Sequence, residues 1–291
     1  MTDLRPDESE VIVTAIGPDH RGLADPIIHC LTQAGANIAE IQMYDRDEAS
    51  QFAMLVRVHL ADDRVERLRA EMKEIGRQTH LMIRTWVPRW GRRARIAICC
   101  TIRQEPVQAI LDAAANGVLP ADPVVVIGNR DRCRPLADNA GVPFEMIGDE
   151  KGEPDNERFM SLIDDYQVDY VVLARYMRLV PPDMCWSFAG GRIINLHHGL
   201  LPGFPGIRPY HAAFASNMLT FGATCHFIVP ELDAGNQIVY QSTFAVPPGT
   251  PLKQVIRQGQ SENEPHCIVE GLRRVVMGEV RLHFHRVIAA G

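Results

Sequence analysis

The chain has 291 residues, of which 46% are hydrophobic and 23% charged, a composition typical of a globular protein with room for two domains. Its formal net charge of −6 argues against a general nucleic-acid binder, and its one basic cluster is too short for a phosphate track, at Arg89, Arg92, Arg93 and Arg95. No apolar run reaches the roughly 18 to 20 residues that a membrane helix needs, so no membrane partner is expected. The acidic N-terminus has no apolar signal core and the seven cysteines show no CxxC pattern, which together predict a cytoplasmic protein with free thiols.

Residues 9 to 87 have the periodicity of a small α+β unit. Apolar alternation predicts its strands, and a stripe of leucine and isoleucine side chains predicts its first helix. In chain order the predicted elements are strand 10–16, helix 23–34, strands 37–43 and 51–59, helix 65–75 and strand 80–87. The order β-α-β-β-α-β is that of a ferredoxin-like fold.

A segment rich in proline, glycine and arginine at 88–94 predicts a linker between two domains, 1–87 and 95–291. After it strands alternate with helices, which indicates an α/β fold with a doubly wound, mostly parallel sheet. The predicted strands are 95–100, 122–127, 143–147, 170–174 and 193–196, and the predicted helices are 105–115, 133–140, 156–166 and 181–188. The remainder predicts helix 210–216, strands 222–229 and 237–244, helices within 252–277 interrupted near Pro265, and a last strand at 280–288.

The strand predicted at 193–196 runs into polar side chains and then into a loop rich in glycine and proline. In a parallel sheet, such a strand end delivers side chains to a cleft. Strand alternation places Asn195 and His197 on one face and His198 on the other. The alternative is a buried strand whose polar end only caps itself.

Several familiar cofactor and catalytic motifs are missing from the sequence. No GxGxxG follows the strand at 95–100, so a nicotinamide dinucleotide is not expected, and there is no Walker-A loop, HExxH helix or GxSxG elbow. A metal site is a less favoured alternative, because adjacent histidines on a strand point to opposite faces. Its candidate ligands are His197, His198, His211 and His226, or His283 and His285 if the last strand is not simply half-exposed. We therefore expect neither a metal nor a tightly bound cofactor.

Three residues form a chemically sensible set for acyl transfer, namely Asn195, His197 and Asp233, which lies in a loop between two predicted strands. The amide of Asn195 can donate to a carbonyl oxygen as negative charge develops there. His197 can polarise the same oxygen or move protons, and Asp233 can orient the histidine and relay a proton. Because the set contains no serine or cysteine, it favours direct attack by water or an amine.

An ordered motif around these residues resembles the folate-dependent formyltransferase superfamily. It reads Asn195-x-His197, Leu201-Pro202-x-Phe204, Gly222-x-Thr224-x-His226-Phe227 and Asp233-x-Gly235, with further matches at Leu173–Met177 and Arg208–His211. The N-terminal unit resembles an ACT domain through its Gly17-Pro-Asp-His-Arg-Gly22 turn and a helix that ends Ala34-Gly-Ala-Asn37. ACT domains dimerise and often bind an amino acid, so this resemblance implies a homodimer or homotetramer. It leaves open whether the unit senses an amino-acid effector or only mediates assembly.

An ACT-like unit followed by this motif is similar to the deformylase branch of the superfamily. The resemblance implies hydrolysis of 10-formyltetrahydrofolate to tetrahydrofolate and formate, with a folate as substrate and Asn195, His197 and Asp233 as catalytic residues. It implies that the pterin lies along two backbone segments, formed by Met177, Arg178, Leu179 and Val180 and by Val229, Pro230, Glu231 and Leu232. It also implies supporting roles for His198, His226 and Gly235.

The choice of water over an amine as formyl acceptor rests on what the chain lacks. The superfamily member that formylates glycinamide ribonucleotide holds a phosphate with a Gly-Ser-Asn turn, whereas Thr101–Pro106 has neither the glycine nor the serine. Three departures from the deformylase pattern keep transfer to an unidentified amine open as the alternative. They are a missing His-Cys-Leu after the strand 95–100, Gly199 in place of a serine, and Gly259-Gln-Ser-Glu-Asn263 in place of a Gly-Arg-Asp start.

Overall fold

The computed structural model describes residues 7–46, 51–88, 93–229, 237–284 and 286–289. The described residues form two compact units. The first comprises those within Met1–Pro88, Val180–Gly190 and Val229–Glu231, and the second comprises the rest. Within the described part of the chain, no helix is long and apolar enough to cross a membrane.

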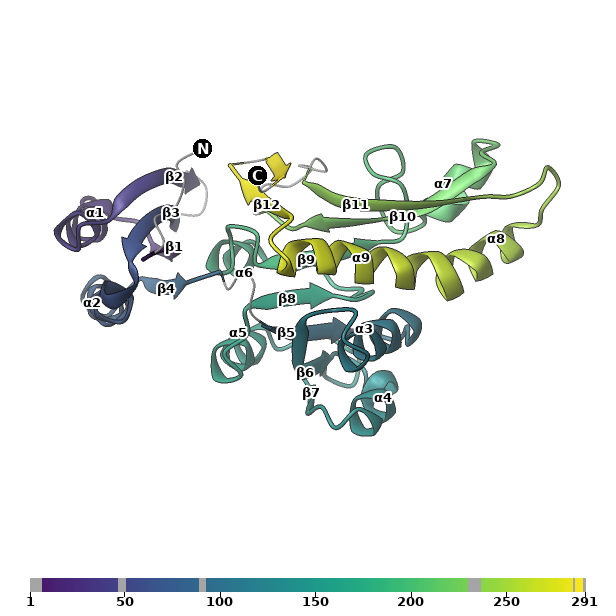
Figure 1. Ribbon diagram of the computed structural model, residues 1–291, viewed down its shortest axis with the longest axis horizontal. Helices are drawn as coiled ribbons and strands as arrows, with labels where there is room; N and C mark the ends of the chain where they lie inside the picture. The colour runs from purple at the N-terminus through teal and green to yellow at the C-terminus, as the bar shows by residue number, and fades with distance from the viewer. Residues whose placement is uncertain (1–6, 47–50, 89–92, 230–236, 285, 290–291) are drawn as a thin grey trace. The chain divides into compact units, whose positions relative to one another are not determined.

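The first unit contains a four-stranded antiparallel sheet in the order β2-β3-β1-β4 (Figure 1). Its elements are β1 Glu8–Pro18, α1 Ala24–Gln33, β2 Asn37–Arg46, β3 Gln51–Ala61, a 3₁₀ helix Asp62–Arg64, α2 Val65–Thr79 and β4 Met82–Trp86. Val11 and Val13 of β1 share one core with buried side chains of both helices, such as Ile27 and Met72. The predicted ferredoxin-like arrangement is confirmed.

The other face of this sheet is covered by α6, Pro182–Ser187, and the residues that follow it. Thr14 Oγ1 donates to the carbonyl oxygen of Ser187 at 3.0 Å, and the Arg84 guanidinium lies 4.9 Å from the ring centre of Phe188. Such cover is needed because β1 is apolar on both faces. The sequence pattern counts residues 180–190 in the second domain, whereas they group with the first unit. The predicted domain bounds themselves stay predictions.

A group of three charged side chains is buried on this covered face. Arg57 Nε lies 3.0 Å from Glu40 Oε2, and Arg57 Nη1 pairs with Glu10. None of the three residues is more than 6% exposed. Arg57 Nη2 also donates to the carbonyl oxygen of Gly190 at 3.4 Å. Arg57 therefore pairs with two buried carboxylates.

The second unit is built on a seven-stranded sheet in the order β11-β10-β9-β8-β5-β6-β7. Its strands are β5 Ala94–Cys100, β6 Ala121–Gly128, β7 Phe144–Met146, β8 Tyr170–Leu173, β9 Ile193–His197, β10 Thr220–Phe227 and β11 Ile238–Ala245. The strands β5 to β9 run parallel, and β10 is antiparallel to both β9 and β11. The predicted doubly wound, mostly parallel sheet is confirmed.

The helix α9, Glu264–Val276, packs against β9, β10 and β11 and against α3. The other helices of this unit are α3 Glu105–Ala115, a 3₁₀ helix Asp131–Cys133, α4 Arg134–Asn139, α5 Asn156–Asp165, α7 Pro209–Ala215 and α8 Leu252–Gln258. Figure 1 shows α8 and α9 as parts of one long rod. The break expected near Pro265 lies instead at Gly259–Asn263, a π-helical stretch between α8 and α9. Pro265 stands directly after this stretch, in the first turn of α9.

The single strand predicted at 280–288 is wrong. The chain forms a hairpin there, with β12 Val280–His283 paired antiparallel to β13 Arg286–Ala289. Phe284 has a φ of 51°, a left-handed conformation that lies in the connection between the two strands. The alternation expected for His283 and His285 therefore ends at this turn, and His285 lies outside the described residues.

Candidate active site

The polar end of β9 lies at the edge of the sheet where the parallel strands end. Asn195 and His197 are both half-buried in this strand. The segments after β8 and β5 begin at the same edge, because parallel strands end together there. The two segments are tied to each other by the backbone N–H of Met177, which donates to Thr101 Oγ1 at 2.9 Å. This edge therefore gathers Asn195, His197 and the first segment predicted to bind folate.

A hydrogen-bonded chain fixes the orientation of Asn195. Its Nδ2 lies 3.0 Å from Nε2 of His226, which is opposite it on β10. The other ring nitrogen, Nδ1 of His226, lies 3.0 Å from the carbonyl oxygen of Phe227. Because a carbonyl oxygen only accepts, Nδ1 carries the proton, and Nε2 accepts from the Asn195 amide. Burial lowers the pKa of His226 to about 4, which keeps this neutral tautomer in place.

His197 and His198 lie side by side in a largely dry environment. His197 Nε2 donates to the carbonyl oxygen of Phe204 at 2.9 Å, so the loop after β9 folds back over the ring. Burial lowers the pKa of His197. The hydrogen bond to the Phe204 carbonyl partly opposes this, and the positive charge of Arg175 adds a smaller lowering. The ring of His198 is 5.7 Å from that of His197, and burial followed by the charge of Arg175 lowers its pKa to about 3. Both imidazoles are therefore neutral near pH 7.

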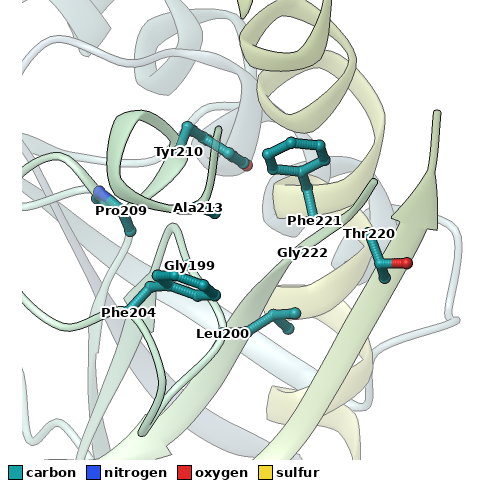
Figure 2. A pocket seen from close by; sticks show the side chains of 9 residues that line it. All are labelled: Gly199, Leu200, Phe204, Pro209, Tyr210, Ala213, Thr220, Phe221 and Gly222. Atoms are coloured by element: carbon teal, nitrogen blue, oxygen red, sulfur yellow. The ribbon is translucent and has the colours of Figure 1, made fainter. Parts of the chain in front are cut away.

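The loop between β9 and α7 is anchored to β10. Thr224 Oγ1, fully buried on β10, donates to the carbonyl oxygen of Gly199 at 2.7 Å and accepts from the backbone N–H of Leu201 at 3.1 Å. Figure 2 shows the hollow beside this anchor, which is lined by Gly199, Leu200, Phe204, Pro209, Tyr210, Ala213, Thr220, Phe221 and Gly222. Its volume of about 10 Å³ leaves room for about one water molecule at most, so it is a packing hollow of the loop and not a folate pocket.

Gly199 is the point of closest approach within this loop. A Cβ atom built on it would lie 2.3 Å from Pro209 Cβ and 3.0 Å from His197 Nε2. Neither neighbour can give way easily, because Pro209 is a buried ring and His197 is held by Phe204. The departure from serine at this position therefore has a local steric reason in this chain.

Replacing Gly199 with serine is expected to displace Pro209 or His197. Overpacking of this kind costs about 1 to 3 kcal/mol of stability, and a misplaced catalytic ring costs about 10- to 100-fold in kcat. Urea unfolding and steady-state kinetics measure the two effects. Gly203→Ala is the matched control, because its nearest contact would be 3.5 Å away, and it should leave both quantities unchanged. A normal kcat in Gly199→Ser would contradict this prediction, because it would show that the loop accommodates the serine side chain without displacing His197.

The residues predicted to bind folate are placed only in part. Met177 and Leu179 are 43% and 91% exposed, whereas Arg178 Nε donates to the carbonyl oxygen of Gly152 at 2.9 Å. Val180 and Val229 group with the first unit. The remaining predicted site residues lie outside the described part of the chain, namely Pro230, Glu231, Leu232, Asp233 and Gly235. The structure thus brings Asn195, His197 and His226 together, and the role of Asp233 stays a prediction.

The histidines considered as metal ligands were His197, His198, His211 and His226, or His283 and His285, of which His285 lies outside the described residues. Among the described residues, no three side chains of histidine, cysteine, aspartate or glutamate are placed to share a metal ion. The ring centres of His197 and His198 are 5.7 Å apart, and His211 is exposed on α7.

Four residues near the site were not singled out from the sequence. Thr224, Tyr210 and Arg175 stand inside the quoted motifs, but none of them was given a role there. Arg175 and Glu264 approach each other at 3.5 Å while lying far apart along the chain. A buried glutamate at a helix start is indistinguishable from an exposed one by sequence pattern, so no signal pointed to this pair.

Acid is expected to destabilise the protein through these buried histidines. An ordinary histidine has a pKa of 6.5, whereas the pKa of His226 is lowered to about 4 in the folded chain. Between these values the unfolded chain binds a proton that the folded chain does not, so stability that is fully present above pH 6.5 is lost as the pH falls. The full loss should be about 3 kcal/mol for this residue, reached as the pH falls to about 4. Urea unfolding followed by circular dichroism should give a flatter pH dependence in His226→Gln, and an unchanged slope would contradict the assignment.

Two sequence families match the chain. The family described as Formyl transferase matches residues 94–272, which carry the parallel sheet and the polar end of β9. The family described as ACT domain matches residues 9–85, which carry the ferredoxin-like sheet. The fold and the larger match define the class: the chain belongs to the formyl transferase family.

Individual relatives narrow this class. Formyltetrahydrofolate deformylase of Escherichia coli (strain K12) is 35% identical over 201 residues, covering 68% of this chain and 70% of that protein. The crystal structure of a formyltetrahydrofolate deformylase from Pseudomonas putida KT2440 is similar with a TM-score of 0.61 at 27% identity, over 97% of this chain and 100% of that one. Glycinamide ribonucleotide transformylase 1 from Symbiobacterium toebii has a TM-score of 0.63 at 29% identity but covers 69% of this chain. Within its class, the chain belongs with the formyltetrahydrofolate deformylases.

Proposed function

We propose that this chain hydrolyses 10-formyltetrahydrofolate to tetrahydrofolate and formate, with Asn195, His197 and Asp233 as its catalytic residues. Membership of the deformylase family supports the reaction. The observation that carries the residue roles is the fixed orientation of Asn195, whose amide is held by His226 beside a neutral His197. An amide donor and an imidazole at one strand end suit the stabilisation of a developing oxyanion.

In the proposed mechanism water attacks the formyl carbon directly. A C–O bond forms, and the carbonyl oxygen becomes an oxyanion that accepts from the Asn195 amide and from the ring N–H of His197. That ring N–H binds the Phe204 carbonyl in this structure, so the loop must release it when substrate enters. Asp233 takes the proton of the attacking water, through His197 or ordered water. The bond from carbon to N10 then breaks as a proton reaches N10.

The binding and supporting roles of the other residues follow from the same family resemblance. The pterin edge would be read by backbone groups of Met177–Val180 and of Val229–Leu232, as small-molecule sites commonly are. His226 supports Asn195 and His198 packs beside His197, while Gly235 keeps the supporting role that the family motif implies. The ACT domain supports regulation by a small ligand, for which an amino acid is our candidate, and assembly as a homodimer or homotetramer. No metal takes part in this scheme.

One assay tests the proposal. The purified chain is incubated with 10-formyltetrahydrofolate, with and without candidate amines, and formate and tetrahydrofolate are followed together. Equal release of both products without any amine is the expected result, and a chelator should leave the rate unchanged. Formyl transfer that requires an amine would replace hydrolysis with the transferase alternative. Loss of activity with chelator would point to a metal hydrolase.

A further inference from the structure

A line of buried polar side chains runs from the histidine pair into the interior of the second unit. The ring of His198 meets that of Tyr210 edge-on, with ring centres 6.0 Å apart. Tyr210 donates its hydroxyl to Glu264 Oε1 at 3.0 Å, and Glu264 Oε2 lies 3.5 Å from Arg175 Nη1. Glu264 is 1% exposed and Arg175 is 7% exposed. The line therefore joins the loop after β8, the start of α9, α7 and the end of β9.

Two irregular stretches of backbone are needed to build this line. Arg175 has a φ of 60°, in the left-handed region that a residue with a Cβ rarely occupies. The π-helical stretch Gly259–Asn263 immediately precedes Glu264 and inserts an extra residue into the helical turn. Gly259 in that stretch lies so close to Tyr210 that a Cβ would be 2.2 Å from its hydroxyl. Strained backbone and π-helices persist mainly where a site requires them, and here both converge on one ion pair.

Stability alone does not account for the pair. A buried ion pair is weak evidence for stability, since the cost of desolvating both charges can exceed their attraction. Arg175 is only partly satisfied, because its Nε and Nη1 have no hydrogen-bond partner among the described residues. Its charge does act on the site, where it lowers the pKa of both His197 and His198. The pair therefore influences the site through the charge and position of Arg175.

We propose that Arg175 is a positioning residue for the acyl-transfer site. It is held by Glu264 and Tyr210, and the line of contacts that runs from it through Tyr210 fixes His198, and with it His197, in place. This proposal rests on the proposed function, in which His197 meets the substrate as a neutral imidazole. Arg175 itself does not touch the reacting atoms. Its effect reaches them through the histidine pair, which the line of contacts holds in place and whose pKa values its charge lowers further than burial alone does.

The sign of the effect follows from the charges around His197. The groups that face it among the described residues are Arg175 from the segment after β8, His198 beside it and His226 from β10. Asp233 lies outside the described residues. Both neighbouring histidines are neutral at working pH, so Arg175 is the cation whose removal should raise the pKa of His197.

The test compares Arg175→Met with Arg175→Lys and Glu264→Gln. In Arg175→Met we expect kcat to fall about 10- to 100-fold, and the acid limb of kcat/KM to move upward by about half to one pH unit. Arg175→Lys keeps the charge, so the limb should stay in place and kcat should recover in part. Glu264→Gln should lower kcat without an upward shift of the limb. Arg158→Met is the matched control, because Arg158 is an exposed, ion-paired arginine on α5 of the same unit.

Direct titration of the histidines separates this proposal from the proposed function. Imidazole NMR signals of the full chain report the pKa of His197 whether or not the protein hydrolyses folate, so failure of the assay alone leaves this test intact. An upward shift in Arg175→Met supports the proposal. An unchanged His197 titration in a folded Arg175→Met variant would overturn it and make the pair merely structural. If that variant does not fold, Arg175→Met with Glu264→Gln removes both charges together and allows the same reading.

Discussion

Replacing Asn195 with alanine is expected to lower kcat about 10²- to 10³-fold while KM changes little. The amide donates to the oxygen only as negative charge develops on it, so its loss is felt mainly in the transition state. Removing one such donor costs roughly 3 to 4 kcal/mol of barrier. The measurement is formate release at saturating 10-formyltetrahydrofolate, with circular dichroism to show that the fold is kept.

Companion variants make this prediction specific. His197→Ala should cost at least as much, and the double variant should cost less than the product of the two, because both groups serve one oxyanion. His211→Ala is the control. His211 is an exposed histidine on α7, and no catalytic role is proposed for it. An Asn195→Ala enzyme that keeps a third of its kcat would remove Asn195 from the chemistry and weaken the whole proposed set.

The order of elements could be predicted because each obeys a strong local pattern. The alternation of β5 to β9 with helices, and the period of α3 at Glu105–Ala115, follow directly from the spacing of apolar residues. The hairpin after α9 could not be predicted from the sequence. Its turn uses Phe284 in a left-handed conformation, and no glycine, proline or asparagine marks the place. The π-helix at Gly259–Asn263 likewise has no signature in side-chain periodicity.

The helix α6 shows a second limit of prediction from sequence, because it packs in the first unit although the chain around it belongs to the second. The apolar side chains of α6 predict a buried helix, but they do not indicate which of the two sheets the helix packs against. The answer lies in β1, where Ile12 and Thr14 are buried on the face away from α1 and α2. A strand that is apolar on both faces predicts that something covers it, and only the structure shows that residues 180–190 do so.

The candidate site was predictable where one strand carries it. Asn195 and His197 follow from the polar end of β9, and the hydrogen bond to His226 follows from the antiparallel neighbour β10. The contribution of Arg175 and Glu264 depends on two irregular backbone segments that meet in space. An ion pair between residues so far apart in the chain depends on tertiary structure, so local sequence propensity does not predict it.

A second large effect is expected far from the chemistry, at Arg57 in the first unit. Arg57→Met removes a cation that pairs with Glu10 and Glu40, both of which are buried. Breaking a buried pair by removing one partner costs about 3 to 5 kcal/mol, because the remaining charge stays desolvated. Here two carboxylates are left close together, so the upper end of that range is expected.

Tryptophan fluorescence can follow this unit during urea unfolding, since Trp86 and Trp186 belong to it and Trp90 lies outside the described residues. The triple change Glu10→Gln, Glu40→Gln and Arg57→Met is the decisive control. It removes all three charges, so it should recover most of the lost stability, because a neutral buried group of similar volume avoids the desolvation cost. If Arg57→Met unfolds like the wild type, the charge group is not buried in solution. If the triple variant is no better than the single one, packing of the Arg57 side chain, and not its charge, holds the sheet to its cover.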